Sequence, residues 1–108
     1  MTTYELAAEL WQVLISAAHN RQMLTYELAG KPIGLGPNTL SDHLGQIQRY
    51  CERNKLPLLP ILVVSKETGK PGRGFPAVDD MDAERERVFA HNWFEMKPPI
   101  ADNFKPID

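Results

Sequence analysis

The stretch TYELAGKPIGLGPNTLSDHLGQIQRYCERN, residues 25–54, decides how the rest of the chain is interpreted. Its first five residues favour a short helix that ends at Gly30, because glycine commonly follows the end of a helix. Residues 31–37 are rich in glycine and proline and predict a turn. A longer helix is then expected from Asn38 to Asn54, with Asn38 or Thr39 as its N-cap. The stretch therefore predicts two helices separated by a tight turn.

The longer helix is predicted to have two distinct sides. Four apolar residues repeat at helical intervals and predict one buried stripe: Leu40, Leu44, Ile47 and Cys51. Four polar residues repeat in the same way and are expected to face outward: Asp42, Gln46, Arg49 and Arg53. We therefore expect this helix to pack on one side and to present polar side chains on the other.

A further helix is predicted before this stretch. Thr2 and Glu5 have the spacing of a capping box. The apolar residues between Leu6 and Ala18 fall at helical spacing but cover more than one stripe. Such a helix either lies at the centre of the core or buries its second side on a partner. Pairing of two copies through this helix is therefore one expectation.

Short extended segments are predicted after the longer helix. Pro57 and Pro60 prevent its continuation. The apolar, partly β-branched run Ile61–Val64 indicates a buried strand. Residues 68–74 hold a turn signal and predict a loop. Residues 75–78 can form a return strand, which the proline among them would confine to a sheet edge. A short β-hairpin is therefore expected here.

The last predicted element is a C-terminal helix. Asp79, Asp80 or Asp82 can start it, and it is expected to run to about Trp93. Residues 95–108 contain three prolines and are predicted to be an extended tail, which either packs through Ile100 and Phe104 or frays. Residues 1–94 would then form one domain. The order of the elements predicts an α+β, mainly helical fold that resembles a winged helix-turn-helix, with a short β-hairpin and an extra C-terminal helix.

Composition sets further limits. The chain has 108 residues, 43% of them hydrophobic, which is enough for one small core. No segment approaches the roughly 18 consecutive apolar residues of a membrane span, so no membrane association is expected. A signal peptide is not expected either, because no basic region precedes Leu6. The single cysteine excludes an internal disulfide framework, which favours a cytoplasmic protein.

Charge is distributed unevenly along the chain. Residues 1–75 hold eight Lys and Arg against six Asp and Glu, whereas residues 76–108 hold four against eight. The first part can therefore present a mildly basic face, although DNA-binding domains are usually more basic than this. The acidic last third could instead contact a protein partner.

One resemblance to a known family begins at Thr25-Tyr26-Glu27-Leu28-Ala29. These residues, the turn at 31–37, the helix at 38–54, the strand at 60–65 and the glycine-bearing loop at 68–75 resemble the winged-helix half of the alkylguanine-DNA alkyltransferases and their alkyltransferase-like relatives. The resemblance covers about half of the chain and implies DNA binding. The active-site Pro-Cys-His-Arg motif of that family is absent, and Pro60-Ile61-Leu62-Val63 stands in its place, which excludes alkyl transfer.

A second resemblance covers residues 50–93. The pairs Tyr50-Cys51, Leu56-Pro57, Thr68-Gly69 and Pro71-Gly72, followed by a helix that ends near Trp93, are similar to small bacterial and phage domains of undefined activity. Those domains occur alone or beside DNA-processing enzymes. This resemblance implies a biological setting, alone or beside DNA-processing enzymes, and it implies no particular reaction.

Ten residues are candidates for contact with DNA. A recognition helix places its N-terminal residues near base edges in the major groove, where Asn and Gln can pair with adenine, Arg with guanine and Asp with cytosine. Basic residues on a neighbouring loop can contact phosphates. The candidates are Asn38, Thr39, Ser41, Asp42, Gln46, Arg49 and Arg53 on the helix, and Lys66, Lys70 and Arg73 on the loop. The alternatives are a solvated helix face and a solvated hairpin.

The sequence carries no pattern that favours catalysis. Cys51 lies on the apolar stripe, where a buried and unreactive thiol is expected. His19, His43 and His91 lack the spacing of metal ligands, so no metal or cofactor is predicted. A small hydrolase would need a cluster of acids or bases, and none is recognisable. We therefore predict a non-catalytic module that binds duplex DNA; the alternative is an accessory or inhibitory protein that contacts a DNA-processing or phage-defence complex through its acidic C-terminal third.

Overall fold

The structure is a computed structural model that describes residues 1–72 and 75–107. The first helix, α1, spans Thr3–His19. The capping box is confirmed: the Glu5 backbone N–H donates to Thr2 Oγ1 at 3.1 Å, and the Thr2 backbone N–H donates to Glu5 Oε1 at 3.0 Å. These two bonds satisfy backbone donors that the first turn of a helix otherwise leaves free.

Helix α1 is the centre of the core. It packs against α3 (Leu40–Arg53), against the 3₁₀ segment Leu59–Leu62 and against a second 3₁₀ segment near the C-terminus. Both of its apolar stripes are covered within the chain, since Leu10, Trp11 and Leu14 are at most 1% exposed. Its exposed positions, such as Glu9 and Gln12, are polar. The homodimer that was predicted through this helix therefore lacks the free apolar surface on which that prediction depended.

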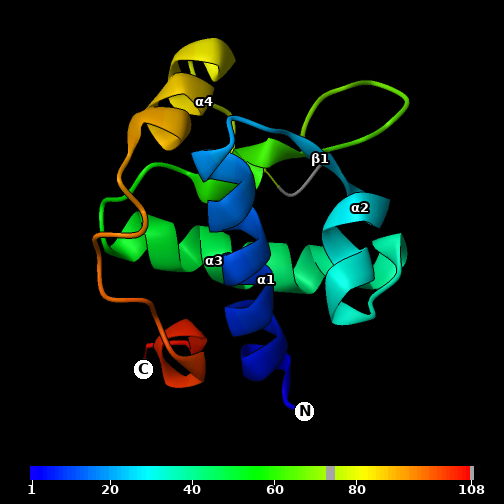
Figure 1. Ribbon diagram of the computed structural model, residues 1–108, viewed down its shortest axis with the longest axis vertical. Coiled ribbons are helices and arrows are strands. Elements are labelled where there is room, and N and C mark those ends of the chain that lie inside the picture. The colour runs from blue at the N-terminus through cyan, green and yellow to red at the C-terminus, as the bar shows by residue number, and fades with distance from the viewer. Residues whose placement is uncertain (73–74, 108) are drawn as a thin grey trace.

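The two helices and the turn predicted within residues 25–54 form close to their predicted bounds. Helix α2 spans Tyr26–Gly30, and Thr25 Oγ1 accepts the Leu28 backbone N–H at its start. Two 3₁₀ turns, Lys31–Ile33 and Pro37–Thr39, lead into α3. In Figure 1, α1 crosses in front of α3, and α2 lies beside one end of α3. The predicted buried stripe of α3 is confirmed, because its four apolar residues are at most 8% exposed.

The sheet differs from the predicted hairpin. Strand β2, Val63–Val64, pairs in parallel with β1, Leu24–Thr25, which precedes α2. The first half of the predicted strand adopts a 3₁₀ turn that contains Pro60. Residues 75–78 are described and form no strand. The physical reason is that Pro76 lacks an N–H to donate to a neighbouring strand, while β2 pairs with β1 instead.

The C-terminal part closes the core. Helix α4 spans Met81–Ala90, with Asp80 Oδ1 accepting the Ala83 backbone N–H. It ends three residues before Trp93, whose Nε1–H donates to the Val88 carbonyl at 2.7 Å. Figure 1 shows α4 beside the C-terminal end of α1, with the C-terminal segment at the other end.

The predicted extended tail folds back onto the body. Its 3₁₀ segment, Ala101–Phe104, places the Phe104 ring against Trp11 and Tyr50 at centroid distances of 6.2 and 5.3 Å. Phe104 is buried, whereas Ile100 is 64% exposed. The compact body therefore extends beyond residue 94, because Phe104 supplies part of the aromatic core.

The predicted α+β, mainly helical class is confirmed. Within the part of the chain that the structure describes, no helix combines the length and the hydrophobicity that crossing a bilayer requires.

Candidate nucleic-acid interface

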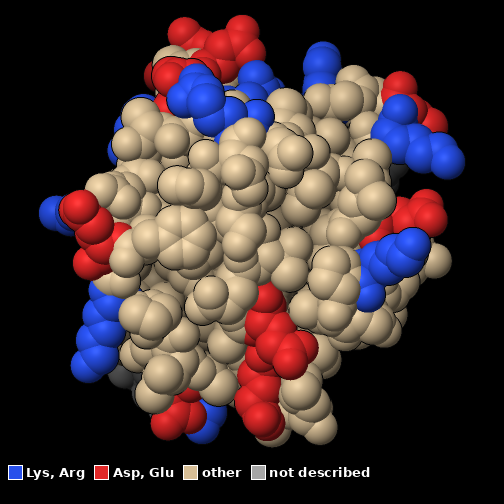
Figure 2. All heavy atoms as spheres, viewed as in Figure 1, with Lys and Arg blue, Asp and Glu red and all other residues tan. Residues whose placement is uncertain are grey.

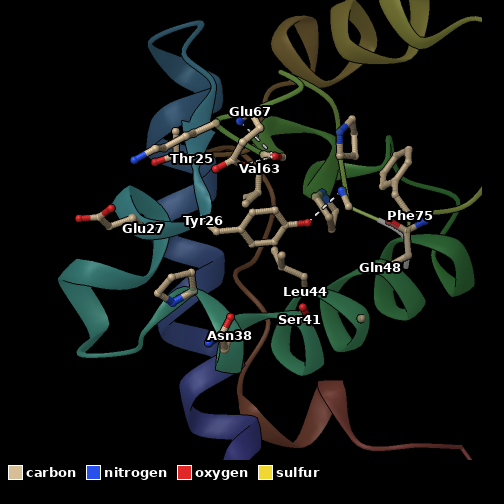
Figure 3. Close-up of a pocket in the computed structure, with 17 residues that line it drawn as sticks. Thr25, Tyr26, Glu27, Asn38, Ser41, Leu44, Gln48, Val63, Glu67 and Phe75 are labelled. Atoms are coloured by element: carbon tan, nitrogen blue, oxygen red, sulfur yellow. Dashed lines mark hydrogen bonds between the residues drawn. The ribbon is translucent and has the colours of Figure 1, made fainter.

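One half-open hollow of about 700 Å³ lies between α3, α2 and the loop after β2. Figure 3 shows α3 along one side of it, with Asn38 and Ser41 near the start of that helix. Lys66 and Glu67, from the loop, also line it, and Figure 3 shows Glu67 on the side opposite Asn38. The hollow therefore brings together the two segments that were predicted to contact DNA.

Tyr26 holds the loop beside α2. Its side chain enters the hollow from the first residue of that helix, and its hydroxyl accepts the backbone N–H of Gly72 at 2.9 Å. A Cβ at Gly72 would overlap this hydroxyl, so only glycine allows so close an approach. The two residues are 46 positions apart, and their contact fixes one end of the loop.

The first half of the loop is a turn with its own hydrogen bonds. The Ser65 backbone N–H donates to the Lys70 carbonyl at 2.9 Å, and the Gly69 N–H donates to the Ser65 carbonyl at 2.7 Å. Gly69 has a φ of 69°, which favours glycine at this position. In Figure 1 this segment stands out as an arc beyond β1. Lys66 and Lys70 are exposed on it, and the third predicted loop cation, Arg73, lies outside the described residues.

The 3₁₀ turn that leads into α3 and the first turn of α3 present small polar side chains. Asn38, Thr39, Ser41 and Asp42 are all exposed. The Thr39 hydroxyl donates to the Gly36 carbonyl at 3.0 Å and makes no N-cap bond to α3. Arg49 is also exposed. Its Nη1 would lie 3.4 Å from a Cβ added at Gly45, and Gly45 lines the hollow, so the guanidinium group lies beside the hollow.

Gln46 does not face outward as predicted. It is 8% exposed, and its Nε2 donates to Thr3 Oγ1 at 3.1 Å. His43 lies beside the same hydroxyl, with its Nδ1 at 3.3 Å. The physical reason is that the start of α1 packs on this side of α3 and covers Gln46. We therefore remove Gln46 from the candidate DNA contacts.

Arg53 lies apart from the other candidates. It occupies the last turn of α3, and its Nη2 donates to the Asn103 carbonyl at 2.7 Å. Together with Asn103 it lines a second, smaller hollow near the C-terminus. Arg53 therefore holds the C-terminal segment and does not share a site with Asn38 and Ser41.

Two side chains of the larger hollow were missed from the sequence. Gln48 lines the hollow and is 7% exposed, and Tyr26 supplies the bond to the loop. A signal for Gln48 was present, because it follows Leu44 by four positions and precedes Cys51 by three. A polar residue at that spacing falls on the buried stripe of the helix.

Charges of both signs surround the hollow. Glu27 and Glu67 lie on its rim together with Lys66. The hydrogen bond from the Ser65 hydroxyl, at 2.9 Å, lowers the pKa of the Glu67 carboxyl and so favours its ionised form. On the face shown in Figure 2, which is seen from the side of α1, basic and acidic side chains are mixed around an uncharged centre. Among the described residues, that face therefore presents separate cations and no broad basic patch.

The acidic residues of the C-terminal third are largely engaged within the chain. Asp82 pairs with Arg85 at 2.7 Å, and Glu86 pairs with Arg21 at 2.6 Å. Buried Glu84 accepts the Leu58 backbone N–H at 2.8 Å and pairs with Arg87 at 2.7 Å. Glu84 is thereby withdrawn from the surface, whereas Asp82 and Glu86 remain exposed beside the arginines that pair with them.

The remaining candidate groups lack reactive surroundings. Cys51 is fully buried, and burial raises the pKa of its thiol to about 12, so it is protonated at neutral pH. Among residues 1–72 and 75–107, no group of three or more His, Cys, Asp or Glu side chains is placed to hold a metal ion. No family model matches the sequence, and no curated protein or solved structure is similar enough to count as a match.

Proposed function

We propose that this protein is a non-catalytic module that binds duplex DNA through the face formed by the first turns of α3 and the loop after β2. The single observation that carries the proposal is that Asn38, in the 3₁₀ turn before α3, and Ser41, in the first turn of α3, line the same hollow as Lys66 of the loop. These two segments are far apart in the chain, and the fold places them on one face. We refer to this face as the α3–loop face.

The α3–loop face divides its contacts between bases and backbone. Asn38 and Ser41 are short polar residues at the start of a helix, the part that reaches base edges when a helix enters the major groove. Lys66 and Lys70 lie on the projecting arc, where they would contact phosphates beside that groove. Arg49, which lies further along α3, would contact either. Thr39 and Asp42 complete the exposed set on the helix.

The charge of this face supports modest affinity. It offers three described cations to phosphates, Arg49, Lys66 and Lys70, and Glu67 lies among them. Each neutralised phosphate contributes about −0.9 to the slope of log affinity against log salt concentration, so three contacts give a slope of about −2.7. Between about 50 and 200 mM salt, affinity would then fall about 40-fold.

Binding through the acidic C-terminal third was the alternative hypothesis. Buried Glu84 is not available to a partner, and arginines beside Asp82 and Glu86 offset their charge, which supports the α3–loop face in preference to that surface. We therefore propose the DNA-binding function alone.

The proposal is tested by fluorescence anisotropy with a labelled random duplex of about 20 base pairs, two turns of the double helix. Lys66→Gln should weaken binding several-fold, and Lys55→Gln should not, although both changes remove one exposed cation. Glu67→Gln should strengthen binding, because it removes a carboxylate that repels phosphate. Equal effects of Lys66→Gln and Lys55→Gln would mean that the contact is not made by this face.

A further inference from the structure

The loop after β2 has internal hydrogen bonds that give it a defined shape. The Ser65 N–H donates to the Lys70 carbonyl, and the Gly69 N–H donates to the Ser65 carbonyl. The Lys70 N–H also donates to Thr68 Oγ1 at 3.2 Å. These bonds close the turn that carries Lys66 and Lys70, but they do not determine where the turn lies relative to α3.

Gly72 attaches this turn to the body of the protein. Its N–H donates to the Tyr26 hydroxyl at 2.9 Å, and its carbonyl accepts the Phe75 N–H at 3.1 Å. Tyr26 and Phe75 both pack against the core. Among the residues that the structure describes, the bond to Tyr26 is the one hydrogen bond that joins residues 66–72 to another helix or strand. The position of the turn therefore depends strongly on one side chain.

Tyr26 is itself held by several elements. It is the first residue of α2, where Thr25 Oγ1 caps the helix. In Figure 3 its ring lies between Leu44 of α3 and Val63 of β2, and its hydroxyl points away from α2 toward the loop. The hydroxyl therefore offers Gly72 an acceptor whose position is fixed relative to α3.

A fixed loop has an advantage in binding. Lys66 and Lys70 can contact phosphates beside a groove that holds α3 only when the spacing between loop and helix suits the duplex. If the fold already sets this spacing, the loop loses less conformational entropy when DNA binds. Without the bond from Gly72 to Tyr26, the turn would keep its internal bonds but would move relative to α3.

We infer that Tyr26 is a positioning residue for DNA binding, because its hydroxyl holds Gly72 and thereby keeps Lys66 and Lys70 at a set distance from the first turn of α3. This role requires no contact between Tyr26 and DNA. The inference rests on the proposed function and adds to it the residue that joins the two parts of the α3–loop face.

The test measures duplex binding by Tyr26→Phe in two backgrounds, by the same fluorescence anisotropy assay in low salt. In the natural background, the loss of this hydrogen bond should weaken binding at least about threefold. In the second background, Lys66, Lys70 and Arg73 are replaced by glutamine, which leaves the loop no cation to position. Tyr26→Phe should there change the affinity by less than about 1.5-fold.

A general loss of stability would give a different pattern, since it would weaken binding by the same factor with and without the loop cations. The matched control is Tyr50→Phe, which removes a tyrosine hydroxyl from the other end of α3. It should leave duplex affinity unaltered in both backgrounds.

A second readout needs no DNA and decides the matter if the glutamine background binds too weakly to measure. The ¹H–¹⁵N heteronuclear NOE of the backbone amides from Lys66 to Lys70 should fall in Tyr26→Phe, because the turn gains freedom on the fast timescale that this measurement reports. The values in α3 should stay the same, and Tyr50→Phe should change neither set.

Two results would overturn the positioning role alone. They are an equal loss of affinity in both backgrounds, and an unchanged NOE of the loop amides in Tyr26→Phe. Failure of the natural protein to bind any duplex in low salt is a separate result, which would remove the proposed function and this inference together.

Discussion

The contact between Tyr26 and Gly72 makes a prediction that can be worked out in detail. The Gly72 N–H donates to the Tyr26 hydroxyl at 2.9 Å, and a Cβ at Gly72 would overlap that hydroxyl. Gly72→Ala must therefore displace either the loop or the tyrosine. Forcing a methyl group into such a place costs about 1–3 kcal/mol of the free energy of unfolding.

Removal of the hydroxyl changes this result. Tyr26→Phe alone loses one hydrogen bond, which costs about 0.5–1.5 kcal/mol. In the phenylalanine background, the nearest ring carbon would lie 3.2 Å from the new Cβ of Gly72→Ala, so a movement of a few tenths of an ångström relieves the contact. The double variant should therefore lose less stability than the two single losses together, by about 1 kcal/mol.

The assay is urea unfolding followed by tryptophan fluorescence, since Trp11 and Trp93 are both buried. The matched control is Gly36→Ala: Gly36 has a φ of −77° and nothing within 4 Å of an added Cβ. That change should leave the free energy of unfolding unchanged or raise it by about 0.4–1 kcal/mol. If Gly72→Ala has no more effect than Gly36→Ala, or if the two losses simply add in the double variant, the inferred position of the loop is wrong.

Three further predictions concern groups away from the hollow. Glu84→Ala should destabilise the protein by about 1–3 kcal/mol in the same urea assay, because it leaves the part-buried Leu58 N–H without its acceptor; exposed Glu86→Ala is the control and should cost less than about 1 kcal/mol. Cys51 should resist iodoacetamide at pH 8 in the native protein and react after denaturation, since burial raises the pKa of its thiol to about 12; rapid labelling of the folded state would contradict its burial. Burial lowers the pKa of His91 below its ordinary value of 6.5, so the folded state binds fewer protons there, and His91 contributes stability that is present above pH 6.5 and is lost as the pH falls through the lowered value. His91→Gln should make the unfolding midpoint less sensitive to pH in that window, and an unchanged pH profile would refute the assignment.

Local sequence signals predicted the helices well. The Thr2–Glu5 capping box, the Asp80 cap of α4 and the buried stripe of α3 each depend on residues within one or two turns of one another. Such contacts can be predicted from spacing along the chain, because residues three or four positions apart lie next to each other on a helix. The amino-acid sequence alone is therefore enough to predict these features.

Contacts between segments that are distant in the sequence could not be predicted from local spacing. The parallel pair of β1 and β2 joins residues about 40 positions apart, and the bond from Gly72 to Tyr26 joins residues 46 positions apart. Gln46 follows the spacing of an outward face and is nevertheless covered by Thr3 of α1. A pattern within one helix shows which residues share a side, but it does not show how many sides neighbouring elements cover.

The candidate site was predicted in part for the same reason. Asn38, Ser41 and Lys66 were named from their place in a helix-turn-helix plan, and the structure brings these three to one hollow. Arg53 shares the helix, but it lies at the opposite end, where it bonds to Asn103. The apolar walls and Gln48 became evident only when three elements were seen to enclose a common space.

The salt dependence of duplex binding is the most direct measure of the proposed contact of Arg49, Lys66 and Lys70 with DNA phosphates. Log affinity against log salt concentration should have a slope of about −2.7 for the natural protein and a slope near zero when all three cations are replaced by glutamine. Replacement of Arg53, Lys55 and Lys97 removes the same charge elsewhere and should leave the slope unchanged. Equal slopes for the two triple variants, or no measurable duplex binding by the natural protein in low salt, would contradict the account.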